Sequence, residues 1–128
     1  MYDNIALLIG HVVGDYLFQN DWMAKNKGEK TARGHWICAL HCAIYSVIVA
    51  AVVVLGGWSY RGEGVILSLL MAWCLAFASH FPIDRYGLAM KWMNFYGQTR
   101  EGPFFPCVYI GVDNGAHLII MWILFSVL

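Results

Sequence analysis

Long apolar runs, separated by short polar stretches, dominate the pattern of the chain. Each run approaches the roughly 20 residues that a helix needs to cross a bilayer, the first one only when its polar flank up to Trp22 is included. Glycines, including the pair Gly56 and Gly57, and charged stretches mark the ends of the runs. The pattern therefore predicts four membrane-spanning helices, at about residues 5–22, 35–55, 65–84 and 107–128.

The stretch between the third and fourth runs has a different pattern. In residues 85–106 aromatic side chains alternate with Arg85, Lys91 and Arg100, which predicts a short interfacial helix followed by a proline-containing loop. Pro82 removes a backbone donor, so we expect the third helix to kink or end near Asp84. The predicted fold is all-α, a single-domain integral membrane four-helix bundle over residues 1–128.

Composition agrees with a membrane location. The chain is 60% hydrophobic and 12% charged, with a mean hydropathy of +0.59, outside the usual range of soluble domains. Its net charge is zero and its pI is about 6.9, so it lacks the basic field of a nucleic-acid-binding protein. The four cysteines form no CxxC pair, which argues against a zinc ribbon or a secreted disulfide framework.

The distribution of lysine and arginine predicts the orientation. The first and third connections carry Lys25, Lys27, Lys30, Arg33, Arg85, Lys91 and Arg100, whereas the second carries only Arg61. By the positive-inside rule the first and third connections are cytoplasmic and both termini lie outside. The N-terminus has no positive region or cleavage site of a signal peptide, so we expect the first segment to be retained.

Metal-binding side chains recur inside the apolar runs. Three His and Asp pairs are spaced four residues apart, which turns the second side chain by only about 40° and keeps both on one helix face. His41 supplies a fourth position, in the second run. In the predicted bundle all of these positions fall at the cytoplasmic ends of the helices. The pairs are His11 with Asp15, His80 with Asp84, and Asp113 with His117.

Carboxylates at membrane depth need compensation. Each costs roughly 2.5–3.5 kcal/mol near a helix centre on insertion scales. Four histidines and three aspartates could bind one divalent metal, or two that share a carboxylate, and zinc, manganese and iron all suit such ligands. The predicted ligands are His11, Asp15, His41, His80, Asp84, Asp113 and His117.

Each residue also has a simpler interpretation. A single His–Asp pair is usually a hydrogen-bonded couple, but three pairs and His41 together favour a metal site or a proton relay. Cys38 could be a soft metal ligand but fits a small buried thiol better, and His35 fits an interfacial side chain. Gln19 would orient a ligand, and Lys25 would neutralise an anionic substrate.

Three stretches together carry a family resemblance: HVVGDYLFQNDWMAKNK ending at Lys27, HFPID from His80, and VDNGAH ending at His117. With them the chain resembles, over nearly its whole length, the bacterial and phage membrane family catalogued as domain of unknown function 3307. Asn114 stands where we expect glutamine in that family. The family in turn is similar to predicted inner-membrane metal-dependent hydrolases, which implies a bacterial inner-membrane location and hydrolysis.

The leading hypothesis is a hydrolase with its metal site near the cytoplasmic boundary. Asp15, His41 and Asp113 would be catalytic, and the substrate would be a small-molecule or lipid-linked ester or phosphoester. The alternatives are a proton or metal carrier, an assembly or exclusion protein with a structural metal, and a di-iron oxidase. Solvent access separates these classes, because a catalytic metal keeps an open position. The oligomeric state stays open.

Overall fold

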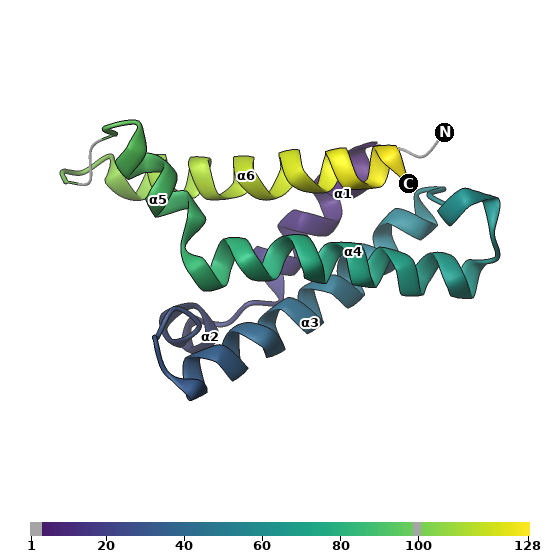
Figure 1. Ribbon diagram of the computed structural model, residues 1–128, viewed down its shortest axis with the longest axis horizontal. Coiled ribbons are helices and arrows are strands. Elements are labelled where there is room, and N and C mark those ends of the chain that lie inside the picture. The colour runs from purple at the N-terminus through teal and green to yellow at the C-terminus, as the bar shows by residue number, and fades with distance from the viewer. Residues whose placement is uncertain (1–3, 99–100) are drawn as a thin grey trace.

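The computed structural model describes residues 4–98 and 101–128, and the regular elements in these ranges are all helical (Figure 1). The all-α prediction is therefore confirmed. In chain order the elements are α1 (Asn4–Val12), the π-helical turn η1 (Val13–Leu17), α2 (Asp21–Asn26), α3 (Ala32–Leu55), the 3₁₀ turn η2 (Tyr60–Gly62), α4 (Val65–Tyr86), α5 (Leu88–Phe95) and α6 (Phe105–Val127).

Three helices, α3, α4 and α6, are long and apolar enough to cross a membrane, and they cover the predicted spans 35–55, 65–84 and 107–128. The prediction of one continuous helix over 5–22 is wrong, because the first apolar helix ends at Leu17. The Asn20 side chain accepts a hydrogen bond from the Met23 N–H at 2.9 Å and caps a separate helix, α2. Such capping satisfies a backbone donor that would otherwise continue the first helix.

The third helix ends close to Asp84, as predicted, and Pro82 lies inside it. α4 continues through this proline to Tyr86 and stops at Gly87, whose φ of 58° is the left-handed conformation that ends many helices. The predicted short helix follows as α5, which buries Ala89 and Met93 and exposes Trp92. This amphipathic pattern suits an element at the surface of a membrane.

The helices are arranged so that the two ends of the molecule differ. In Figure 1, α4 lies between α3 and α6, with α2 and α5 at one end. At the other end the Trp58 indole donates to the Phe125 carbonyl at 3.1 Å. There Gly56 also packs so closely on α1 that an added Cβ would lie 2.6 Å from the Ala6 Cβ. The start of α1, the end of α6 and the connection between α3 and α4 thus meet.

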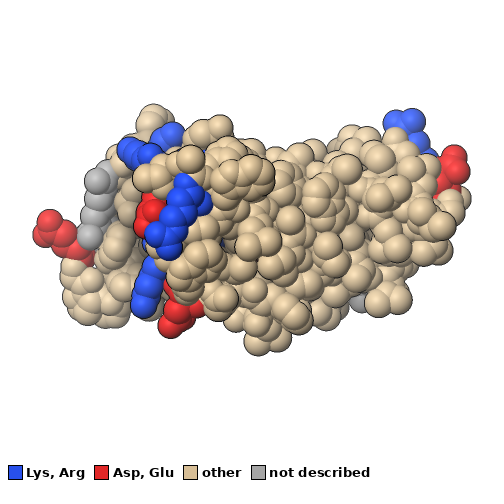
Figure 2. Space-filling view, turned by 90° about the horizontal axis from the view of Figure 1, so that it is seen from below, with Lys and Arg blue, Asp and Glu red and all other residues tan. Residues whose placement is uncertain are grey.

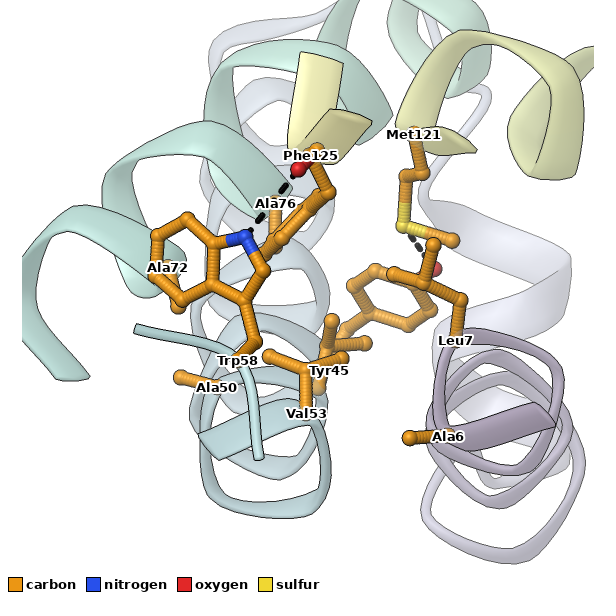
Figure 3. Close-up of a cluster of buried hydrophobic side chains, with 11 residues drawn as sticks. Ala6, Leu7, Tyr45, Ala50, Val53, Trp58, Ala72, Ala76, Met121 and Phe125 are labelled. Carbon is orange, nitrogen blue, oxygen red and sulfur yellow. Dashed lines mark hydrogen bonds between the residues drawn. The ribbon is translucent and has the colours of Figure 1, made fainter. Parts of the chain in front are cut away.

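An apolar cluster fills this second end (Figure 3). Small side chains such as Ala50 and Ala72 let the helices approach closely, and Trp58 and Phe125 fill the space between them. Tyr45 forms the inner edge of the cluster, where its hydroxyl lies 3.2 Å from the Met121 sulfur. Beyond Tyr45 the buried side chains become polar.

Charged side chains lie at the two ends of the face shown in Figure 2, and the long surface between them carries none. Exposed apolar side chains, including Ile66, Leu70 and Ile119, cover the spanning helices. A soluble protein rarely exposes an apolar surface of this extent. Together with the three spanning helices, this surface identifies a membrane protein.

Candidate metal centre

Asp15 enters the site on an irregular turn. The Phe18 N–H reaches the Val13 carbonyl at 3.2 Å, a contact across five residues that widens the helix around Asp15. Turns of this kind are rare and are often found at functional sites. Gly14 packs against the Tyr45 ring, where a Cβ would lie only 2.6 Å from Cδ2. The absence of a side chain at Gly14 therefore lets η1 approach α3.

Two imidazole nitrogens and two carboxylate oxygens converge between η1, α3 and α4. His41 Nε2 lies 3.1 Å from His80 Nε2. Asp15 Oδ1 is 3.2 Å from the His41 nitrogen and 3.4 Å from the His80 nitrogen. Asp84 Oδ2 is 3.3 Å and 3.2 Å from the same two atoms. Metal bonds of about 2.0–2.1 Å separate adjacent ligand atoms by about 3.3 Å in a tetrahedral site and about 2.9 Å in an octahedral one. Each carboxylate oxygen, taken together with the two imidazole nitrogens, therefore has the spacing of three ligands on one ion.

His117 adds a fifth donor to this set. Its Nδ1 lies 2.8 Å from the Asp113 carbonyl, and since a carbonyl only accepts, Nδ1 must carry the proton. The lone pair is then on Nε2, which lies 3.5 Å from Asp84 Oδ1. Metal-binding histidines commonly donate their other ring N–H in this way, which fixes the tautomer and the ring orientation.

Unpaired buried atoms test whether the residues suit a cation. Among the described residues, Asp15 Oδ1 and His117 Nε2 are buried without a hydrogen-bond partner. Each nevertheless lies at ion-pair distance from another site residue, Asp15 Oδ1 at 3.2 Å from His41 Nε2 and His117 Nε2 at 3.5 Å from Asp84 Oδ1. An unsatisfied buried acceptor costs about 1–3 kcal/mol. A divalent ion would satisfy both lone pairs and offset the two carboxylate charges, so the donor set fits such an ion.

His11 lies beside this set but differs from it in its hydrogen bonds. Its Nε2 is 2.6 Å from Asn114 Oδ1, and the Asn114 amide nitrogen donates to the Ile110 carbonyl at 2.7 Å. His11 Nε2 must therefore be the donor, and Nδ1 faces the Tyr45 hydroxyl at 2.8 Å. Both ring nitrogens thus already have hydrogen-bond partners. His11 therefore fits the role of a residue that positions the ligands better than its predicted role as a ligand.

Tyr45 was not predicted as a site residue. Its ring stacks on His80 with centroids 3.8 Å apart, and its hydroxyl contacts His11. In the sequence it is one aromatic residue within an apolar run, a pattern typical of a core position. Only the packing of α3 against α1 and α4 shows that it holds two histidines in place.

The lysine that lies at the site is Lys27, whereas the sequence analysis predicted Lys25 as the residue that would neutralise an anionic substrate. Lys27 Nζ lies 2.6 Å from Asp84 Oδ2, and its side chain is 19% exposed. Lys25 is exposed. Burial disfavours the charge of Lys27, but the attraction of Asp84 outweighs this effect and raises the pKa of the lysine above its ordinary value. Lys27 was already part of the stretch that carried the family resemblance.

A cavity of about 370 Å³ opens onto the polar cluster. Its lining comes from η1, α2, α4 and α6 and includes Asp15, Lys27, Asp84 and Asp113. The Asp113 carboxylate is 22% exposed and lies 3.7 Å from His117 Nδ1, so it faces the cavity at the edge of the ligand set. Gln19, which was predicted to orient a ligand, also lines the cavity, and its amide nitrogen donates to the Asp15 backbone carbonyl at 3.3 Å.

Two buried thiols lie close to Asp84. Cys38 and Cys42 each place a sulfur within 4.8 Å of the other and of an Asp84 oxygen. This grouping could hold a second cation that shares Asp84 with the histidine set. Lys27 already contacts the same carboxylate, so a charge stands near this position in the structure.

Comparison with known proteins identifies the family. The sequence profile described as protein of unknown function (DUF3307) matches residues 4–128. The chain belongs to this family. The resemblance inferred from the three stretches is thereby confirmed, because the DUF3307 match includes all of them. Searches of curated proteins and of solved structures give no match.

Proposed function

We propose that this member of the DUF3307 family is a membrane-embedded, metal-dependent hydrolase of an ester or phosphoester. The observation that carries the proposal is the convergence of five donors from four helical segments beside an open cavity: His41, His80, His117, Asp15 and Asp84. The residues suit zinc or manganese, and iron would also bind them. Polar side chains at membrane depth are costly and usually functional.

The cavity favours a catalytic over a purely structural site. A structural zinc is enclosed by its ligands, whereas a catalytic ion keeps a position for water or substrate. Here two of the five donor residues, Asp15 and Asp84, form part of the cavity wall. A small molecule in the cavity would therefore reach the ligand set directly.

Residues of the chain can take separate roles in hydrolysis. A bound divalent ion would supply an activated water and polarise the ester. Asp113 lines the cavity without being held in the central set, so its carboxylate can accept a proton during attack. The Asn114 amide and the Tyr45 hydroxyl hold His11, and Tyr45 also supports the His80 ring, so these two residues keep the donors in position.

The membrane setting completes the proposal. The short apolar helix of residues 4–17 packs against α3 and α6 and would complete a four-helix membrane bundle with the three spanning helices. The excess of lysine and arginine at the end that carries α2 and α5 supports a cytoplasmic location for that end and for the cavity, in a bacterial inner membrane. A substrate would enter from the cytoplasm or from the adjoining lipid leaflet.

Cysteine labelling tests this orientation. In a background with Cys74 and Cys107 changed to serine, Ser59→Cys should react with an impermeant maleimide in intact spheroplasts. Lys25→Cys should react only after permeabilisation, because the positive-inside rule places it in the cytoplasm. Both positions are exposed, so a difference reports sidedness. The opposite pattern would refute the proposed orientation.

Metal analysis combined with substrate screening tests the function. Detergent-purified protein should contain one or two equivalents of a divalent metal by plasma mass spectrometry. It should hydrolyse a nitrophenyl phosphoester or carboxylic ester and lose this activity when the metal is chelated, with recovery on adding the metal back. Bound metal without turnover of either ester class would favour the structural role. Protein without metal would leave a hydrogen-bonded His–Asp relay.

A further inference from the structure

Lys27 is placed to contact whatever occupies the cavity. It follows the last residue of α2, and the connection that carries it is also fixed to the end of α4, because Arg85 donates to the Glu29 carbonyl at 2.9 Å. The Lys27 ammonium has three N–H donors, one of which reaches Asp84 Oδ2 at 2.6 Å. Its side chain lines the cavity together with Asp113 and Asn114.

The charges around the cavity change when a cation binds the histidine set. Asp15 and Asp84 both contact the same histidine nitrogens, so a divalent ion held there would offset their two negative charges, while Asp113 adds a third carboxylate to the cavity wall. Asp84 then no longer depends on Lys27 for neutralisation, and the ammonium adds a positive charge to the cavity wall. A positive charge beside a metal centre favours an anionic ligand.

Tyr16 provides a second donor on the same wall. Its hydroxyl oxygen accepts a hydrogen bond from the Asn114 amide at 2.6 Å, so its own proton remains available to a ligand. Tyr16 and Lys27 both line the cavity. A neutral carboxylic ester has no charge to pair with an ammonium, whereas a phosphate group has oxygens for both donors.

We infer that Lys27, with Tyr16, binds the phosphate group of the substrate, which makes the substrate class of the site phosphoesters. The inference rests on the proposed hydrolytic function and narrows it. The phosphate could belong to a soluble phosphoester or to a lipid headgroup, since the two share the chemistry that Lys27 recognises.

Phosphate binding to the metal-loaded protein tests the inference without relying on turnover. Calorimetry would measure the binding of inorganic phosphate, and then of a short-chain phosphatidic acid in mixed micelles, to wild type, Lys27→Met and Lys25→Met. Both variants lose one positive charge close to α2, but Lys25 is exposed. We expect Lys27→Met to weaken phosphate binding about tenfold or more with unchanged metal content, and Lys25→Met to bind like wild type.

The outcomes separate this inference from the proposed function. Equal binding by Lys27→Met and wild type, equal weakening in both variants, or no phosphate binding by metal-loaded wild type would overturn the inference and leave metal-dependent hydrolysis in place. Loss of metal from Lys27→Met would also overturn it, because Lys27 would then act by holding Asp84. Weaker binding of both inorganic phosphate and phosphatidic acid by Lys27→Met, but not by Lys25→Met, supports the inference. Whichever of the two ligands binds wild type more tightly then identifies the source of the phosphate.

Discussion

Replacing Asp84 by asparagine is expected to remove the bound metal and abolish hydrolysis. Asp84 contacts three histidines, with Oδ2 3.3 Å from His41 Nε2 and 3.2 Å from His80 Nε2, and Oδ1 3.5 Å from His117 Nε2. Losing an outer-shell partner costs about 10–100-fold in metal affinity, and a direct ligand costs more. Metal content by plasma mass spectrometry and turnover of a nitrophenyl ester measure the effect.

Asp113→Asn is the matched control for this substitution. It makes the same chemical change at the cavity edge, where the carboxylate lies outside the central donor set. We expect it to keep its metal and to lose only activity, with Asp15→Asn behaving like Asp84→Asn. Helix content by circular dichroism confirms that each variant is folded. Full metal content in folded Asp84→Asn and Asp15→Asn would refute the ligand assignment.

Gly14→Ala is expected to disturb the site indirectly, by displacing the Tyr45 ring. The new Cβ would lie 2.6 Å from Tyr45 Cδ2 and 3.1 Å from Cε2, so the ring must move. Tyr45 stacks on His80 and contacts His11, so its shift displaces a donor and the residue that supports it. Overpacking costs about 1–3 kcal/mol, and we expect metal affinity to fall by about 10–100-fold. Competition with a chelator and a thermal melt measure the two effects.

Gly111→Ala makes the same change in α6, where a Cβ meets nothing within 4 Å. It should retain the metal affinity and melting temperature of wild type, since no neighbour must move. If Gly14→Ala also behaves like wild type, η1 does not need its close approach to Tyr45, and the role assigned to Tyr45 is wrong.

The spanning helices could be predicted because hydropathy is a local property of the chain. α3, α4 and α6 follow their apolar runs closely. The prediction of a single helix over the first run was wrong because Asn20 caps α2 and starts a new helix there. Hydropathy does not report capping, so it could not show that the first helix ends before this point. The predicted end of the third helix near Asp84 is close to the observed one, since α4 tolerates the one donor missing at Pro82 and ends where Gly87 adopts a left-handed φ.

The orientation of individual site residues depends on contacts between distant segments. The spacing of four puts each His–Asp pair on one helix face, but it does not say which member turns to the centre. His11 turns to Tyr45 and Asn114, and Asp113 turns to the cavity. Lys27 reaches Asp84 although Lys25 does not, because Lys27 lies just past the end of α2 and extends in a different direction from a residue two positions earlier in the helix.

By itself the sequence determined the membrane class, the three long helices and the recurrence of His and Asp at one helical spacing, because each of these follows from residues near one another in the chain. The tertiary structure decided which donors meet, which histidine carries its proton on which nitrogen, and which lysine faces the cavity. Those features depend on hydrogen bonds and packing between residues as far apart as His11 and Asn114, and no local pattern records them.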